Sequence, residues 1–203
     1  MKVNLKALVL SLLIGTATQA QTIFVNNTDT AGNRIVQTSN QKGGGEINLD
    51  DSVSNRGVIF FAAGYQSATT AGKLVGTYYI DLNIVHNDNR LGCLRQLESR
   101  AILTLEDGTK IECIQISDSD CDNAAFHGAF ALMPKGGGTT ETMQQNFDTL
   151  MTTGIIEIKV ITTEKELVYK VKKDFVPYLK KHFALIDKTV KGGSKVTNSI
   201  KTN

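Results

Sequence analysis

The stretch 98–118, ESRAILTLEDGTKIECIQISD, decides the fold, because an Asp-Gly pair between apolar, β-branched runs predicts a hairpin. Two strand alignments compete. A two-residue loop would set Leu103 opposite Glu112. A three-residue loop, with Gly108 left-handed, would set Leu103 opposite Ile111. We expect the second, because burial of one apolar face selects the register. It gathers five side chains on one face: Ala101, Leu103, Leu105, Ile111 and Cys113.

The same strand alignment predicts which cysteines lie close together. Cys93 and Cys121 lie beyond the two open ends of the hairpin, at equal distances along the chain from its centre. We therefore expect a Cys93–Cys121 disulfide, which would stabilise the fold by roughly 3–4 kcal/mol in the chain-entropy model. Cys113 would then be an unpaired core thiol that behaves as a small apolar residue. A Cys113–Cys121 bridge with Cys93 free, or no bridge, are the alternatives.

The start of the chain has the pattern of a secretory signal peptide, at residues 1–20. Lys2 and Lys6 form a basic start, residues 7–15 an apolar run, and residues 18–20 a small-x-small cleavage site. We expect an exported protein, either periplasmic or at the cell surface or outside the cell. No later stretch approaches about 20 apolar residues, so the sequence predicts no membrane span.

Charge and composition narrow the classes of function. The chain has 22 Lys and Arg against 20 Asp and Glu, and the leader carries two of the lysines and no acid. A neutral mature chain gives no electrostatic case for nucleic acid as a partner. Its length suits one domain with a proper core. Three cysteines are too few for a disulfide scaffold, although an exported protein permits a bridge.

The first half of the mature chain predicts strands. Residues 21–55 are polar and Gly-rich, and we expect an irregular N-terminal layer there, with short strands. An apolar run at 58–63 favours a buried strand, and small residues at 66–72 a turn. Residues 74–85 alternate with period two, which predicts a long strand with one apolar face. Within these segments the expected short strands are 22–25, 34–37 and 46–49, and the apolar face of the long strand carries Tyr78, Ile80, Leu82 and Ile84.

The second half mixes strands with two helices. Thr140 is expected to cap a short helix that ends at Gly154. Asp174 is expected to cap a longer C-terminal helix, with Pro177 in its first turn. His182 lies among lysines of that helix and is expected to face solvent. Strands are expected at 125–133, 155–161 and 167–171, and the single domain at 21–190 precedes a disordered tail at 191–203.

Together these elements predict an α+β fold, with a mainly antiparallel, twisted sheet and the C-terminal helix packed on one face. Four segments, YYIDLNIV, AILTLEDGTKIE, IIEIKVITTEKELVYKVKK and DFVPYLKKHFALID, resemble those of a group of small exported proteins common in Bacteroidota. The similarity covers roughly residues 78–187. It implies a strand-rich body, an Asp-Gly hairpin, an amphipathic C-terminal helix and an envelope location, and it carries over no functional residues.

An acidic loop offers the best candidate metal site. Asp118, Asp120 and Asp122 occupy positions 1, 3 and 5 of a loop, as the first ligands of a calcium loop do. The rest of that pattern fails, because position 6 is Asn123 and position 12 is Ala129, which lacks the bidentate carboxylate. A solvated acidic turn is the expected reading, and calcium binding is the alternative.

No catalytic constellation is recognisable. The three histidines are scattered, no Cys-x-x-Cys occurs, and the Gly triplets at 43–45 and 136–138 lack the Lys-Ser/Thr of a phosphate loop. We expect a non-enzymatic exported binding or structural protein, with no cofactor and an envelope protein as its partner. A small-ligand or calcium-binding module is the first alternative. An unrecognised hydrolase that uses scattered carboxylates is the second.

Overall fold

The computed structural model shows an antiparallel sheet with two helices, which confirms the predicted α+β class. Three predicted segments lie wholly or mostly outside the described residues: the signal peptide, the strand at 46–49 and the tail at 191–203, of which Lys191 and Gly192 instead belong to the last helix. None of the described helices is long and apolar enough to cross a membrane. The structure describes residues 22–39, 41–42, 57–85, 91–121 and 125–192.

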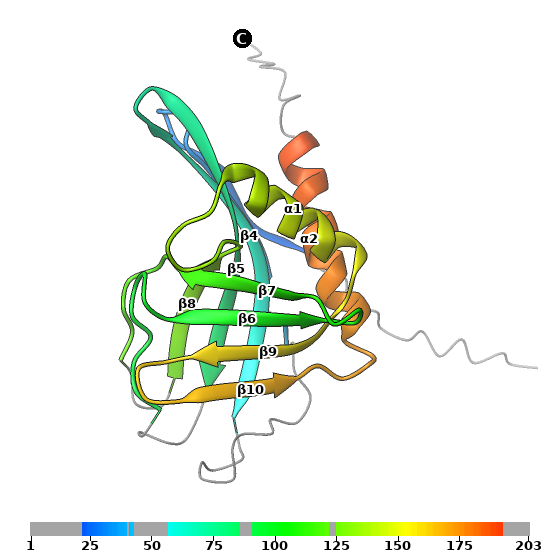
Figure 1. The fold of residues 1–203 in the computed structure, drawn as a ribbon. Helices are drawn as coiled ribbons and strands as arrows, with labels where there is room; N and C mark the ends of the chain where they lie inside the picture. The colour runs from blue at the N-terminus through cyan, green and yellow to red at the C-terminus, as the bar shows by residue number, and fades with distance from the viewer. Residues whose placement is uncertain (1–21, 40, 43–56, 86–90, 122–124, 193–203) are drawn as a thin grey trace, which may run out of the picture.

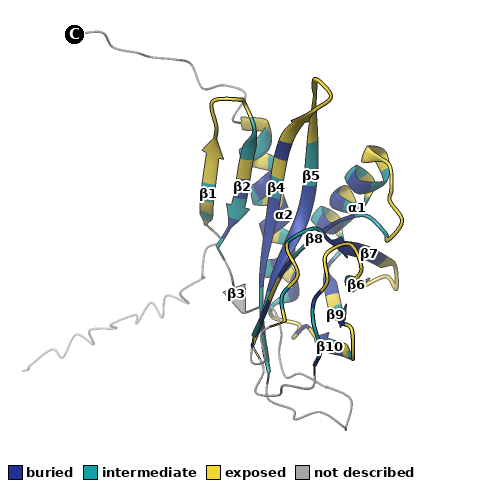
Figure 2. Cartoon of the chain, turned by 90° about the vertical axis from the view of Figure 1, so that its left-hand side faces the viewer, coloured by how far each residue is buried: buried dark blue, intermediate teal, exposed yellow. Residues whose placement is uncertain are grey.

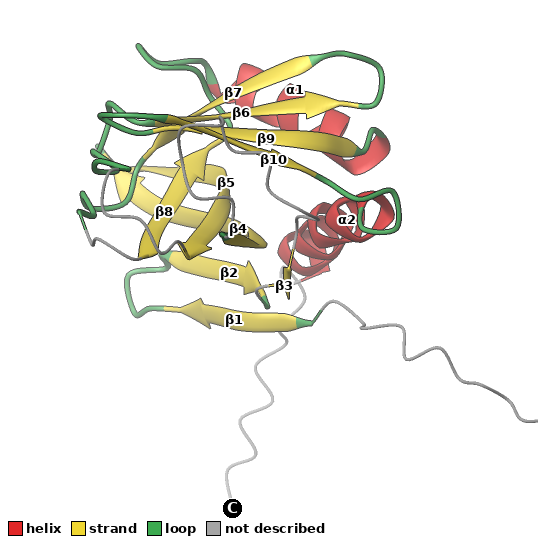
Figure 3. Ribbon diagram, turned by 90° about the horizontal axis from the view of Figure 1, so that it is seen from below, coloured by secondary structure: helices red, strands yellow, loops and turns green. Residues whose placement is uncertain are grey.

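The strands follow the order β1, β2, β4, β5, β8, β7, β6, β9, β10 across the sheet, and β3 pairs with β4. The sheet bends strongly, so that β6, β7, β9 and β10 lie across from β1 and β2, with α2 beside the opening (Figure 3). Figure 1 shows both helices on the same side of the sheet. The strands are β1 (Ile23–Thr28), β2 (Arg34–Thr38), β3 (Gln41–Lys42), β4 (Val58–Thr70), β5 (Lys73–Val85), β6 (Arg100–Leu105), β7 (Lys110–Gln115), β8 (Ala125–Ala131), β9 (Ile155–Ile161) and β10 (Glu166–Lys170); the helices are α1 (Thr140–Thr152) and α2 (Val176–Gly192).

The hairpin of β6 and β7 has the predicted three-residue register. Leu103 pairs with Ile111, and Ala101 with Cys113. Gly108 has a φ of 85°, in the left-handed region that this loop requires of its third residue. The pairing therefore places all five predicted apolar side chains in the core.

The disulfide prediction is also confirmed. Cys93 and Cys121 form the bridge, and Cys113 is free and buried. Burial of Cys113 raises the pKa of its thiol, because a thiolate is costly in an apolar interior. Cys113 is therefore an inert core residue, as predicted.

The long strand β5 has the predicted faces. Ile80, Leu82 and Ile84 are fully buried in the core beneath the helices. On the opposite face Val85 is 46% exposed, but Tyr79 and Asp81 are buried, each 4% exposed. Figure 2 shows this burial along β4 and β5. Tyr78 stacks on Phe147 of α1, with ring centroids 3.8 Å apart. The alternation of the sequence therefore fixed which face α1 and α2 cover.

Some boundaries differ from the prediction. The strand expected at 58–63 continues to Thr70, and the expected turn region at 66–72 narrows to Ala71 and Gly72, both at positive φ. Each flanking residue pairs directly across, Thr70 with Lys73, so this is a two-residue hairpin loop. The short strands expected at 22–25 and 34–37 of the N-terminal layer are present as β1 and β2, and they extend the sheet beyond β4.

The helix starts are shifted slightly from the expected caps. Thr139, one residue before the expected cap, accepts a hydrogen bond from the Thr142 N–H at 3.1 Å and caps α1. The last helix begins at Val176 after a turn in which the Lys172 carbonyl accepts from the N–H groups of Phe175 and Val176. Asp174 lies within that turn.

His182 is the clear error of the sequence analysis. It was expected to face solvent, and its side chain is fully buried instead. The cause is that α2 contacts β2 and β4 on one side and α1 on another, so its buried stripe is wider than one sheet face would require.

Arg34 of β2 joins the two ends of the described chain. Its guanidinium donates to the Thr189 carbonyl at 3.0 Å and to the Val190 carbonyl at 3.2 Å, in the last turn of α2. It also donates to Asn26 of β1 at 3.1 Å. A cation at a helix C-terminus satisfies carbonyls that lack intrahelical partners and interacts favourably with the helix dipole.

Candidate functional site

A groove lies over the end of β7, beside Leu97 and the turn that follows β8, and we call it the β7 groove. Its volume is about 460 Å³, within the range of about 300–1,000 Å³ that ligand sites occupy. Its lining is almost wholly apolar, with one charged residue. The lining residues are Leu97, Ile114, Ile116, Met133, Pro134, Lys135, Gly136 and Gly137.

The floor of the groove is made by Ile114 and Ile116. The ladder between β7 and β8 is short, with Ile114 opposite Ala131 and Gln115 opposite Phe130. Ile116 continues it by donating to the Ala129 carbonyl at 2.8 Å. Since alternate residues of a strand share a face, Ile114 and Ile116 point to the same side, and this is the side away from the core residue Cys113.

Leu97 forms one wall in an unusual conformation. Its side chain is 62% exposed, and its φ of 59° lies in the left-handed region. That region costs a residue with a Cβ about 1–2 kcal/mol. The Leu97 N–H donates to the Gln115 carbonyl at 2.9 Å, which fixes the residue beside β7. Strain at an exposed apolar residue is a recognised mark of functional sites.

The opposite wall is the turn that follows Met133. Gly136 and Gly137 have φ values of 93° and 96°, a backbone that only glycine adopts readily. The Gly137 N–H donates to the Pro134 carbonyl at 3.2 Å. The Lys135 N–H donates to the Glu112 carboxylate at 3.0 Å, which ties the turn to β7. Gly136 and Gly137 thus shape one side of the groove.

Charges of both signs lie beside the apolar lining. Arg100 pairs with Ile114 across the strands, and its guanidinium lies 3.6 Å from the Glu112 carboxylate. Both side chains keep about a third of their surface exposed, at 34% and 31%. The Arg100 Nε is buried and has no hydrogen-bond partner among the described residues. The groove therefore combines an apolar floor with a polar margin.

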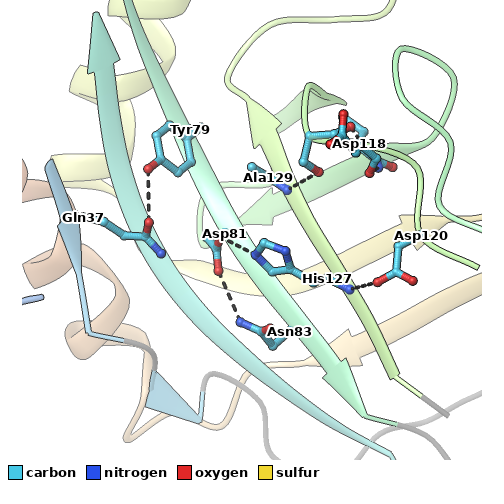
Figure 4. Close-up of polar contacts among 10 residues, drawn as sticks. Gln37, Tyr79, Asp81, Asn83, Asp118, Asp120, His127 and Ala129 are labelled. Atoms are coloured by element: carbon cyan, nitrogen blue, oxygen red, sulfur yellow. Dashed lines mark hydrogen bonds and ion pairs between the residues drawn. The ribbon is translucent and has the colours of Figure 1, made fainter. Parts of the chain in front are cut away.

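The acidic loop does not assemble a metal site in the described part of the chain. The Asp120 carboxylate accepts from the His127 N–H at 2.8 Å, at the edge of β8. Asp118 and Asp120 do not converge on a common point (Figure 4), and Asp122 lies outside the described residues. Within the described residues no group of three or more His, Cys, Asp and Glu could hold a metal ion. Asp120 is accounted for as a structural partner of β8.

A histidine–carboxylate pair on the face away from the helices was missed by the sequence analysis. His127 Nε2 lies 2.7 Å from a carboxylate oxygen of Asp81, and Asn83 donates to the other oxygen at 3.2 Å (Figure 4). The hydrogen bond to Asp81 raises the pKa of His127. Alternation placed Asp81 and Asn83 on one face, but no sequence signal indicated that β8 would pair beside β5.

This pair lacks the arrangement of a nucleophilic catalyst. That chemistry requires a hydroxyl or thiol within reach of the imidazole. In the described ranges, no side-chain hydroxyl or thiol hydrogen-bonds to His127, and the nearby Tyr79 hydroxyl donates to Gln37 at 3.2 Å instead. Burial raises the pKa of Tyr79 to about 12. The contacts of this face are thus those of a hydrogen-bonded surface.

Comparison of the chain with models of known families, with curated proteins and with solved structures finds no match in any of the three.

Proposed function

We propose that this chain is an exported, non-enzymatic binding protein whose β7 groove receives an apolar side chain of an envelope protein. The observation that carries this proposal is the groove's lining, in which Leu97 is held exposed at a strained φ of 59° beside Ile114, Ile116 and Met133. An apolar concavity with a few polar groups at its margin is the usual form of a binding site.

A protein partner suits the margin of the groove better than a simple hydrocarbon does. Arg100 and Glu112 offer one charge of each sign beside the floor, and Lys135 is exposed on the turn. A peptide presents both backbone dipoles and side chains to such groups, whereas an aliphatic chain presents neither. Burial of an exposed leucine contributes about 1–2 kcal/mol to binding, so Leu97 supplies a useful part of the affinity.

An oxidising compartment is consistent with the Cys93–Cys121 bridge. The leader pattern at residues 1–20 and the resemblance to small exported proteins support the same location. Fractionation of the native cell, with the protein detected in the periplasm or at the surface, tests this part of the proposal. Recovery in the cytoplasm with a reduced Cys93 would contradict it.

The groove itself is tested with displayed random peptides. We expect the folded, disulfide-bonded protein to enrich peptides that share an apolar or aromatic anchor. Ile116→Asp places a charge on the groove floor and should weaken their binding at least about tenfold, as measured by calorimetry. Val85→Asp is the matched control, because Val85 is an exposed apolar residue of β5 outside the groove.

Two outcomes would contradict the proposal: no enrichment of any peptide, or equal binding by the wild type and Ile116→Asp. Saturable binding of an apolar dye such as N-phenylnaphthylamine, lost in Ile116→Asp and without any peptide binding, would instead indicate a small-molecule site.

A further inference from the structure

One edge of β5 lacks a strand neighbour in the described part of the chain. β4 pairs with β5 along its whole length, from Thr70↔Lys73 to Val58↔Val85. β8 pairs with the other side of β5 only from Tyr79 to Val85. Residues 73–77 therefore have a second side to which no described strand is bonded, and we call this stretch the free edge.

Hydrogen bonds at Tyr78 show which backbone groups the free edge presents. The Tyr78 N–H donates to Met143 Sδ at 3.3 Å, and its carbonyl accepts from the Leu132 N–H at 3.0 Å, so both groups point away from β4. Backbone direction alternates along an antiparallel strand. The N–H and C=O groups of Gly76 and Leu74 therefore point outward as well, and those of Val75 point toward β4.

The free edge is apolar and projects from the body. Leu74 is 61% exposed and Val75 43% exposed. The tip of the β4–β5 hairpin extends beyond the rest of the sheet (Figure 1). The edge at β10 is different, since it carries exposed Glu166 and Lys170. Charged side chains are a usual protection of an edge strand against pairing with another chain, and Lys73 alone supplies one on the free edge.

We propose that the free edge pairs antiparallel with the same residues of a second copy of this chain, around a two-fold axis at Val75. A two-fold interface requires self-complementarity, in which each contact occurs twice. Leu74 of each copy then forms a hydrogen-bonded pair with Gly76 of the other. Val75 then lies opposite Val75 of the other copy. Because the N–H and C=O groups of each Val75 point toward β4 of its own copy, the two residues form a non-hydrogen-bonded pair.

Charge, length and shape agree with this register. Lys73 lies opposite Thr77, so no like charges meet directly across the strands. The free edge has Val75 at its centre. In this register Tyr79, where the part of β5 paired with β8 begins, falls opposite Ala71 in the turn of the other copy, so the ladder between the copies ends at that turn. The two bodies therefore lie at opposite ends of the shared ladder.

Side-chain packing adds an apolar contact. The ring of Tyr65 covers Gly76 so closely that a Cβ there would lie 2.6 Å from the Tyr65 hydroxyl oxygen. Leu74 of the second copy, directly opposite Gly76, shares this face and would pack against that ring. Aromatic cover of a strand glycine together with a cross-strand aliphatic residue is a stabilising arrangement in sheets.

A cysteine at the two-fold axis tests the register. In Val75→Cys the two thiols face each other across a non-hydrogen-bonded pair, whose Cβ separation of about 5 Å is close enough for a disulfide after a small adjustment. We expect a covalent dimer on mild oxidation, seen as doubled mass on a non-reducing gel and reversed by reductant. Val85→Cys is the matched control, because it is similarly exposed on the same strand but lies in the part that pairs with β8.

A lysine at the same position tests the association itself. Val75→Lys sets two like charges directly opposite and should weaken dimerisation at least about tenfold in sedimentation equilibrium. Val85→Lys should leave it unchanged, and circular dichroism should show the same fold for both. A wild-type protein that stays monomeric at every concentration would overturn the proposal. A dimer that is unaffected by Val75→Lys, or equal crosslinking by both cysteine variants, would do so too.

Discussion

The two described histidines occupy opposite faces of the same sheet and are held in opposite ways. His182 is buried beneath α2, where its Nδ1 lies 2.7 Å from Thr38 Oγ1 and its Nε2 has no partner among the described residues. Burial lowers the pKa of His182 to about 4. His127 lies on the far face, where the Asp81 carboxylate raises its pKa.

The difference shows what stabilises each face. The helix-covered face is an apolar core, with Phe61 in edge contact with both His182 and Phe183, and it excludes charge. The opposite face near β8 depends on specific ties instead: the Cys93–Cys121 bridge and the carboxylates that contact His127. We therefore expect acid to weaken the first face, and reductant or carboxylate removal to weaken the second.

The largest effect should come from the bridge. Replacing Cys93 and Cys121 by serine should lower the free energy of unfolding by about 3–4 kcal/mol, because the closed loop then contributes entropy to the unfolded chain. Urea unfolding measures the change. Reductant should have the same effect on the wild type, and Cys113→Ala is the control for loss of a thiol. A change of less than about 1 kcal/mol would contradict this account of the far face.

Acid should produce the next largest effect, through His182. Its folded pKa of about 4 lies below the ordinary 6.5, so the unfolded state binds more protons and stability falls as pH decreases between these values. The full loss is on the order of 3 kcal/mol. The protein keeps this stability above about pH 6.5 and loses it as the pH falls toward the folded pKa. Urea unfolding at several pH values measures the loss.

Substitution distinguishes His182 from the other titrating groups. His182→Leu should remove this part of the acid sensitivity, because no imidazole then has to be protonated in the core. His127→Gln is the control and should retain it. An acid profile that His182→Leu leaves unchanged would place the sensitivity elsewhere, in the carboxylates.

The carboxylate of Asp120 should contribute less. Asp120→Ala removes the acceptor of the His127 N–H and should cost about 1 kcal/mol. Amide hydrogen exchange at His127 should also become faster, and NMR measures both effects. Asp118→Ala is a matched control, because the contact of Asp118 with Gln115 uses its backbone carbonyl, which alanine keeps. Equal effects of the two variants would argue against a stabilising role for the hydrogen bond between the His127 N–H and the Asp120 carboxylate.

The smallest effect on stability should come from Asp81→Asn. The asparagine keeps the shape of the buried carboxylate but not its charge, so the pKa of His127 should fall toward its ordinary value in an NMR titration. The raised pKa contributes stability that is present below about pH 6.5 and lost as pH rises through the folded value. Because His127 is half exposed, the change in unfolding free energy should stay below about 1 kcal/mol. His182 is the internal control, and its titration should not move.

The hairpin and its disulfide could be predicted from the sequence because burial of one apolar face decided both. Only one register buries Leu103 and Ile111 together. Extending that register along the chain places Cys93 opposite Cys121. The long alternation of β5 was predictable for the same reason. In each case the local pattern and the tertiary environment required the same face to be buried.

The rest depended on neighbours that lie far along the chain. His182 sits among lysines, which locally favours solvent, but α2 packs against α1, β2, β4 and β9. The turn at Ala71 and Gly72 lacks the Asn or Asp that usually marks such a loop. The β7 groove needs Leu97 and Met133 to meet beside β7, and no spacing in the sequence encodes that meeting.

The contact of Arg34 with the last turn of α2 has a consequence for the order of folding. The guanidinium comes from the second strand, and the carbonyls that it binds lie more than 150 positions later in the chain. The early strands can already pair with β4, but until synthesis has released that final helix the Arg34 guanidinium lacks these carbonyl acceptors. Such distant contacts are slow to form, so maturation should be a late, whole-chain event, and a truncation before residue 189 should leave the N-terminal strands sensitive to protease.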